Sequence, residues 1–220
     1  MTAPELLSWA RGTGLQIAVI VFCAGLLLRA FEIFMLGQRK NLAETRSDGV
    51  SEGLRTIARR FLPIDRNTLQ RSLFMVIAGY TFHIGLLLVI FFLAPHIQLF
   101  KSVLGFSWPS LATPIIDFAT VVAMVALMAL LWRRITHPVL KLLSTAEDYL
   151  VWAITFLPLL TGYMSYHHLL LPYTWMLAIH ILSVELMLVL FPFTKLTHTF
   201  TIFLARWYNG MMAGQKGVAQ

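Results

Sequence analysis

The chain has 220 residues, of which 58% are hydrophobic and only 12% are charged, and its mean hydropathy is +0.76. These values exclude a soluble globular protein of this size, because too few polar side chains remain to cover its surface. The formal net charge of +7 does not indicate nucleic-acid binding, since the basic residues alternate between connecting segments as topology signals do.

Five apolar stretches are each close to the roughly 20 residues of helix that a bilayer requires. In chain order they cover residues 14–36, 73–95, 114–131, 149–166 and 173–196. The first is not read as a cleaved signal peptide, because its basic cluster follows the apolar run instead of preceding it. We therefore predict an all-α integral membrane bundle of five transmembrane helices, with residues 1–220 forming a single membrane domain.

The basic residues predict the orientation of these spans. Residues 38–72 are rich in arginine, whereas the second connection contains only Lys101. The third connection carries Arg133, Arg134 and Lys141, and the fourth carries no basic residue. Because cytoplasmic loops hold the excess of Lys and Arg, the first and third loops and the C-terminus are predicted to be cytoplasmic and the N-terminus to lie outside.

The cytoplasmic loop of residues 38–72 contains the pattern SEGLRTIARRFLPI. On a helix, this pattern places Leu54, Ile57, Ala58 and Phe61 on one face and the arginines 55, 59 and 60 largely on the other. It predicts an amphipathic surface helix. Two partners suit such a helix, namely anionic membrane lipid and an acidic protein.

Two histidines lie inside the predicted spans and a third, His198, lies in the apolar segment that continues the last one; an ionisable side chain in a membrane helix is costly and needs a function. His180 and His198 are eighteen residues apart, which on one continuous helix is five turns, with both rings on one face and separated by roughly 27 Å. His83 lies on the second span. Because neutral imidazole is a common axial ligand of haem iron, the pattern predicts bis-histidine haem b with His83, His180 and His198 as ligands.

His96 follows His83 by thirteen residues and is a further candidate ligand. It can face His180 while His83 faces His198, or it can be an interfacial histidine in contact with water. His167 and His168 are the reserve ligands on the outer side, and His137 before Pro138 is interpreted as structural.

Two segments carry a resemblance to a known family. LFPFTKLTH at residues 190–198, together with His180, and FHIG at residues 82–85 resemble the gamma subunit of respiratory nitrate reductase. Related membrane cytochrome b subunits occur in sulfur-metabolism and heterodisulfide-reductase-like complexes. The resemblance implies that His83 and His198 ligate the haem nearer the cytoplasm and that His180 ligates the outer haem.

The chain departs from the family pattern at Leu93, where the family has the second outer ligand. Three alternatives follow: His96 takes this role, the ligand comes from elsewhere, or His83 pairs with His180 and only one haem is bound. The resemblance also implies a location in a bacterial or archaeal cytoplasmic membrane. The function that it implies is electron transfer between the quinone pool and a cytoplasmic iron–sulfur subunit, as part of an oxidoreductase complex. With Cys23 as its sole cysteine, the chain cannot hold such a cluster itself.

The candidate quinone and proton residues are Lys101, Asp117 and Glu185. Lys101 lies near Phe100, Phe106 and Trp108, and the family uses a lysine near its outer haem for quinol binding; alternatively, the lysine extends to lipid headgroups. Asp117 and Glu185 are candidates for accepting quinol protons. Glu185 is also suited to a polar contact that locks two helices together.

A haem-free transporter or membrane anchor is the alternative function. In that case the intramembrane histidines and Glu185 relay protons, and the protein has no visible absorption. The eighteen-residue histidine spacing and the absence of an inverted repeat favour the cytochrome.

Overall fold

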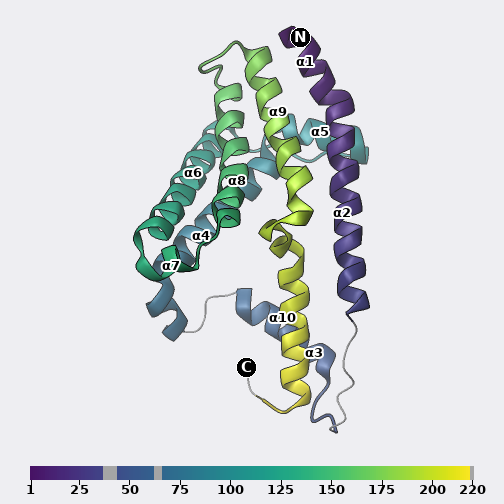
Figure 1. The fold of residues 1–220 in the computed structure, drawn as a ribbon, viewed down its shortest axis with the longest axis vertical. Helices are drawn as coiled ribbons and strands as arrows, with labels where there is room; N and C mark the ends of the chain where they lie inside the picture. Colours follow the sequence, from purple (N-terminus) through teal and green to yellow (C-terminus); the bar gives the residue numbers. More distant parts are fainter. Residues whose placement is uncertain (37–43, 62–65, 219–220) are drawn as a thin grey trace. The chain divides into compact units, whose positions relative to one another are not determined.

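The computed structural model describes residues 1–36, 44–61 and 66–218, and every regular element in these ranges is helical (Figure 1). This confirms the all-α prediction. The longer helices are α2 (Leu15–Met35), α4 (Arg66–Phe92), α6 (Thr113–Thr136), α8 (Ala146–Tyr166), α9 (Tyr173–Leu190) and α10 (His198–Gln215). The shorter ones are α1 (Ala3–Trp9), the π-helical turn η1 (Ala10–Gly14), α3 (Gly49–Phe61), α5 (Ala94–Leu104), α7 (Pro138–Leu143) and the 3-10 turns η2 (Phe191–Phe193) and η3 (Lys195–Thr197).

Four helical segments among the described residues are long and apolar enough to cross a membrane. They are Ala3–Met35, Ser72–Phe92, Thr113–Thr136 and Tyr173–Phe193. The protein is therefore a multi-pass membrane protein. The predicted span 149–166 coincides with α8, which does not belong to this set of four. Residues 38–43 and 62–65 of the predicted cytoplasmic loop lie outside the described residues.

The helices group into two compact units. The first comprises Met1–Ile20 and Phe74–Val189, and the second comprises Val21–Leu73 and Leu190–Gln220. In the first unit, Phe82 of α4, Ala123 and Leu127 of α6, and Leu159 of α8 form the buried core. Gly85 lets α4 approach α6 closely, since a Cβ there would lie 2.8 Å from the Ala119 carbonyl oxygen.

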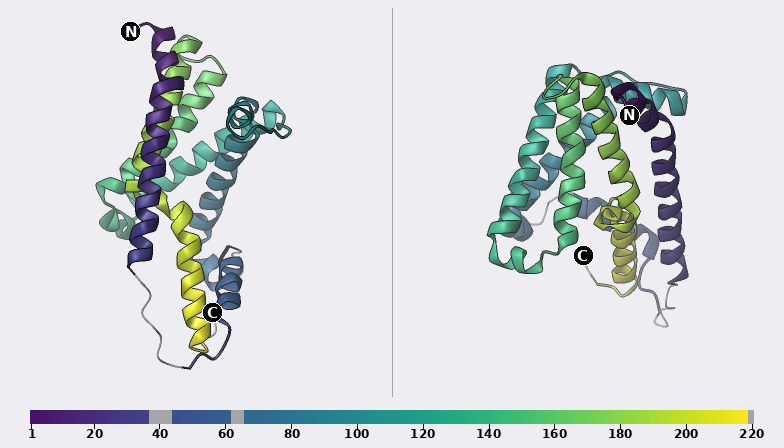
Figure 2. Two further views of the ribbon diagram at one scale, coloured as in Figure 1. Left: turned by 90° about the vertical axis from the view of Figure 1, so that its right-hand side faces the viewer. Right: turned by 45° about the horizontal axis from the view of Figure 1, so that its top comes forward.

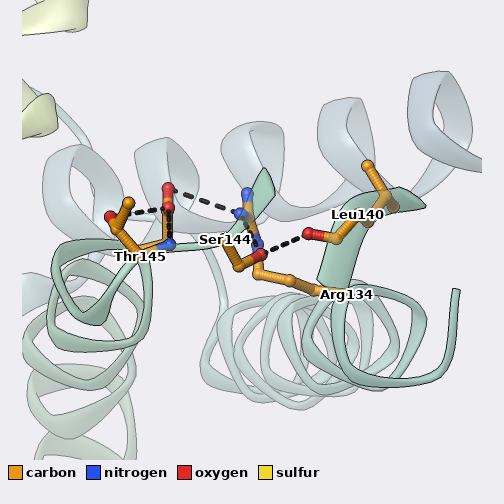
Figure 3. A network of polar contacts seen from close by, with 5 residues as sticks. Arg134, Leu140, Ser144 and Thr145 are labelled. Carbon is orange, nitrogen blue, oxygen red and sulfur yellow. Dashed lines mark hydrogen bonds and ion pairs between the residues drawn. The ribbon is translucent and has the colours of Figure 1, made fainter. Parts of the chain in front are cut away.

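α7 connects one end of α6 to α8 (Figures 1 and 2), and a polar network joins the two helices there (Figure 3). Arg134 donates to Ser144 Oγ at 3.0 Å and pairs with Asp148 at 3.3 Å. Ser144 in turn donates to the Leu140 carbonyl, and Asp148 accepts from the backbone N–H of Thr145. The basic connection thus caps the first turn of α8 and ties the two helices together.

In the second unit, α3 and α10 pack side by side through two pairs of glycines spaced four residues apart (Figure 1). A Cβ on Gly53 would lie 2.5 Å from the Trp207 ring, and one on Gly210 would overlap the Thr56 hydroxyl. At the other end, the Arg206 guanidinium lies 4.3 Å from the centre of the Phe61 ring. The contacts run antiparallel and allow backbone-to-backbone packing of the kind that small residues permit.

The predicted helix in this loop is present as α3. Gly49, Gly53 and Thr56 face α10 and are buried, whereas Leu54 is 59% exposed and Ala58 is exposed. Small residues therefore make the contact with α10, and the use of the predicted apolar face by lipid or a partner stays a prediction.

Two predicted spans end earlier than expected. The span predicted at 173–196 ends as α9 at Leu190, because Pro192 has no N–H with which to continue the helix. Pro192 is fully buried, packs where Gly25 has no side chain, and has its carbonyl bonded by Arg29 Nε at 2.9 Å. His180 and His198 therefore lie on separate helices, and the prediction of one continuous helical face was wrong.

The span predicted at 73–95 ends as α4 at Phe92. Leu93 has extended backbone angles (φ −75°, ψ 127°), and α5 begins at Ala94 with Pro95 in its first turn. His83 and His96 are consequently on different helices. The direction of the His96 ring is set by this break and not by the thirteen-residue spacing.

The close α3–α10 packing generates a test. Replacing Gly210 with Val should separate the helices at an expected cost of about 1–3 kcal/mol, because the new side chain overlaps Thr56. Hydrogen–deuterium exchange of the α3 amides should become faster. Gly12→Val is the control, since a Cβ at Gly12 meets nothing within 4 Å. Unchanged α3 protection in Gly210→Val would contradict the packing.

Candidate functional site

The imidazole rings of His96 and His180 face each other in the first compact unit. Their centres are 6.3 Å apart and their planes differ by 18°. With a metal–nitrogen bond of about 2 Å and a nitrogen about 1 Å from its ring centre, two imidazoles on opposite sides of one metal have centres about 6 Å apart. The spacing of the two rings therefore fits one metal atom between them.

The hydrogen bonds of His96 fix which of its ring nitrogens carries the proton. Nδ1 lies 2.9 Å from the Val89 carbonyl oxygen, which can only accept, so Nδ1 is the donor. Burial lowers the pKa of His96, which favours the neutral ring. In that form Nε2 holds a lone pair, as a metal ligand requires.

His180 is oriented in the same way by α8. Its Nδ1 lies 3.3 Å from Thr161 Oγ1, and the Thr161 hydroxyl donates its own hydrogen to the Leu157 carbonyl at 2.7 Å. The imidazole is therefore the donor and Nε2 keeps its lone pair. Gly162 makes room for the ring, since a Cβ at that position would lie 2.9 Å from His180 Cε1.

In His83 and His198, as in His96, Nδ1 donates a hydrogen bond to a backbone carbonyl. His83 Nδ1 donates to the Gly79 carbonyl at 2.7 Å, one turn earlier on α4. His198 is the first residue of α10, and its Nδ1 donates to the Lys195 carbonyl at 2.7 Å. Both are exposed. The pairing of His83 with His198 stays a prediction.

The other histidines are arranged differently. His167 directs Nε2 to Asp117 Oδ1 at 3.0 Å, so the nitrogen that a ligand would use is engaged. His168 has a left-handed backbone (φ 54°) and packs on the Tyr173 ring at 4.9 Å. His137 connects α6 to α7 and is exposed. The candidate proton acceptor Asp117 is thus paired with a histidine.

Lys101 is exposed on α5, next to a series of aromatic contacts. The rings of Phe91 and Phe100 stack with centres 5.7 Å apart, and the Phe100 and Trp108 centres are 5.6 Å apart. Beside them is a shallow apolar groove of about 590 Å³, lined by Ile84, Leu87, Leu88, Phe91, Phe92 and Trp108. Lys101 is not part of the lining.

Glu185 is buried on α9, with 7% of its surface exposed. Its Oε1 has no hydrogen-bond partner among the described residues. The carboxyl packs against Gly14 of the N-terminal helix, where a Cβ would lie 2.9 Å from both of its oxygens.

Sequence reasoning missed Thr161 and Gly162, which orient His180 and make room for it. A threonine followed by glycine within an apolar stretch was the only available signal, and it is equally typical of ordinary helix packing. In the described part of the chain, no three His, Cys, Asp or Glu side chains come together to hold a metal ion. A haem would need only two axial ligands from the protein, because its macrocycle supplies the other four nitrogens, and the spacing of the paired histidines is compatible with that number.

Comparison with known proteins identifies a relative. No protein-family model matches the chain, and no solved structure matches it. A protein of Nitratidesulfovibrio vulgaris (strain Hildenborough) is 31% identical over 208 residues, which cover 91% of this chain and 90% of the relative. With this identity over nearly the full length of both proteins, the chain belongs to the same family as that Nitratidesulfovibrio vulgaris protein.

Proposed function

We propose that the protein is a haem b membrane subunit that transfers electrons between the quinone pool and a cytoplasmic iron–sulfur partner. The observation that carries this proposal is the opposed pair of His96 and His180, whose ring centres are 6.3 Å apart. Haem iron held by two imidazoles alternates between ferric and ferrous states and so accepts and donates one electron at a time.

The chain's own residues prepare this site. The Val89 carbonyl and the Thr161 hydroxyl hold the two Nδ1 atoms, so each Nε2 keeps the lone pair that a metal ligand needs. This fixed geometry limits movement of the ligands when the charge of the iron changes. His96 is therefore our proposed outer ligand in place of the family histidine at the position of Leu93.

A second haem, with His83 and His198 as the ligands that the family resemblance implies, is also proposed. In both residues Nδ1 donates to a backbone carbonyl, which leaves Nε2 available as a metal ligand. His198 starts α10 directly after the 3-10 turn of Lys195–Thr197. The resemblance of residues 190–198 to the nitrate reductase gamma subunit supports this assignment.

We also propose α8 as the fifth span, with the N-terminus outside and the C-terminus in the cytoplasm. Support comes from the length of α8 and from its packing on α6, where the Trp152 indole donates to the Leu127 carbonyl at 2.9 Å. The basic residues of the α6–α8 connection favour a cytoplasmic position by the positive-inside rule. The proposed location is a bacterial or archaeal cytoplasmic membrane.

The apolar groove along α4 is the proposed quinone site. Its volume of about 590 Å³ lies within the usual range of small-molecule sites. Phe91 of the lining stacks on Phe100. Lys101, which follows Phe100 in the sequence but lies outside the lining, is the proposed polar contact for a quinone oxygen. Asp117 and its partner His167 are candidates for taking up the quinol protons.

Replacing either His96 or His180 with Ala tests the outer site. Each variant should lose the same single b haem, because both ligands bind one iron. A reduced-minus-oxidised spectrum with pyridine haemochrome quantification measures the loss. His167→Ala is the control and should retain all haem, since its Nε2 is engaged by Asp117. Full haem content in His96→Ala would contradict the assignment, and no haem in native wild-type membranes would favour the transporter or anchor.

Replacing His198 with Ala tests the second site. We expect loss of one haem spectrum with normal membrane insertion, while the haem on His96 and His180 remains. Redox titration of the remaining haem separates the two signals. An unchanged spectrum would remove His198 from the ligand set.

Replacing Gly162 with Ala tests how His180 is accommodated. The added methyl would lie 2.9 Å from His180 Cε1 and should turn or displace the ring. The electron paramagnetic resonance signal of the ferric outer haem should therefore shift, since it reports the angle between the two imidazole planes. Gly12→Ala adds a methyl in open space and should leave the signal unchanged. Equal signals in the two variants would rule out the contact.

A further inference from the structure

The buried carboxyl of Glu185 has no role in ligating the proposed haem. It lies in the span formed by α9, is 7% exposed and has one oxygen without a hydrogen-bond partner among the described residues. A buried polar atom without a partner is rare in proteins and is often explained by function.

The facing helix has a glycine, Gly14, at the position where it meets this carboxyl. Gly14 ends the π-helical turn of Ala10–Gly14, and a Cβ there would lie 2.9 Å from both carboxyl oxygens and from the Trp9 ring. Ala10 in the same turn is completely buried. π-Helical turns of this kind are rare and occur frequently at functional sites. The turn and its glycine make a space that is just large enough for the carboxyl.

No positive charge neutralises Glu185 within the described part of the chain. On α9 the other titratable groups are Tyr173 and His180, and Nδ1 of His180 donates to Thr161. On the facing helical segment Ala3–Met35 the charged groups are Glu5 and Arg11, which are exposed, and Arg29 and Glu32, which pair with each other at 2.8 Å. An unpaired carboxylate in a membrane span is costly, whereas the protonated acid is much less so. The carboxyl is therefore suited to exchanging a proton and not to balancing a fixed cation.

Glu185 follows His180 by five residues on α9, a rise of about 7.5 Å along the helix axis. If His180 held a haem, reduction of that haem would add negative charge to the same membrane segment as this carboxyl. In a medium of low dielectric constant, that charge favours uptake of a proton nearby.

We propose that Glu185 is a redox-linked proton site. One proton from the aqueous phase binds the Glu185 carboxylate when one electron reaches the iron between His96 and His180, and the proton leaves when the electron leaves. This inference rests on the proposed function, because it requires a haem at that pair of histidines.

The test is a redox titration of the outer haem as a function of pH, using the purified full-length protein. In the wild type, the midpoint potential should fall as pH rises, because reduction is accompanied by proton uptake. In Glu185→Gln this dependence should be largely lost. The redox infrared difference spectrum should also lose its protonated-carboxyl band. Glu5→Gln, at an exposed acidic residue, should behave as the wild type.

A second variant keeps the test valid if Glu185→Gln does not fold. Gly14→Ala retains the carboxyl and places a methyl against it, so the carboxyl band should shift in frequency. An unchanged pH dependence and an unchanged band in both variants would overturn the proton site while leaving the haem assignment intact. A haem-free preparation would overturn both proposals, and haem quantification distinguishes this result from the former.

Discussion

A helix that ends leaves its last backbone carbonyls without N–H partners, and this requirement shapes the C-terminal end of α4. The Phe91 carbonyl accepts from the Trp108 indole at 2.6 Å, and the Phe92 carbonyl accepts from the Leu111 backbone at 3.1 Å. The chain that leaves the helix thus folds back and supplies these two missing donors. The Val89 carbonyl accepts from the Leu93 backbone N–H at 3.3 Å and also from Nδ1 of His96 at 2.9 Å. The returning chain therefore also holds the imidazole that faces His180.

The His96 side chain can therefore make a structural hydrogen bond through one ring nitrogen and present the other as a proposed metal ligand. A histidine has two ring nitrogens, and the one that donates to the helix end determines where the other points. α8 positions His180 in a similar way. The Thr161 hydroxyl accepts a hydrogen bond from Nδ1 of His180, and Gly162 leaves room for the ring. The two rings are therefore held from opposite sides by separate elements, which fixes their spacing independently of any bound group. In the proposed haem site, such preorganisation would favour rapid electron transfer, because little rearrangement would accompany the change of charge.

Much of the helical architecture was predictable from the apolar stretches, because length and hydropathy alone identify membrane helices. The breaks were not predicted. Pro192 ends α9, but the Arg29 and Gly25 contacts that stabilise the break come from a distant part of the chain. Proximity of His96 to His180 was one of several alternatives, since it depends on the extended backbone at Leu93. The contact of α3 with α10 was not predicted, because periodicity identifies faces of large apolar side chains, whereas the packing there uses glycine.

The break between α9 and α10 has a consequence for how the protein can evolve. If His180 and His198 shared one rigid helix, a rotation or shift that changed the position of one imidazole would move the other by the same amount. Instead, two short 3-10 turns separate them. Substitutions within the turns can alter the angle and surroundings of His198 while leaving those of His180 unchanged. Selection can therefore change the orientation and environment of each histidine independently of the other.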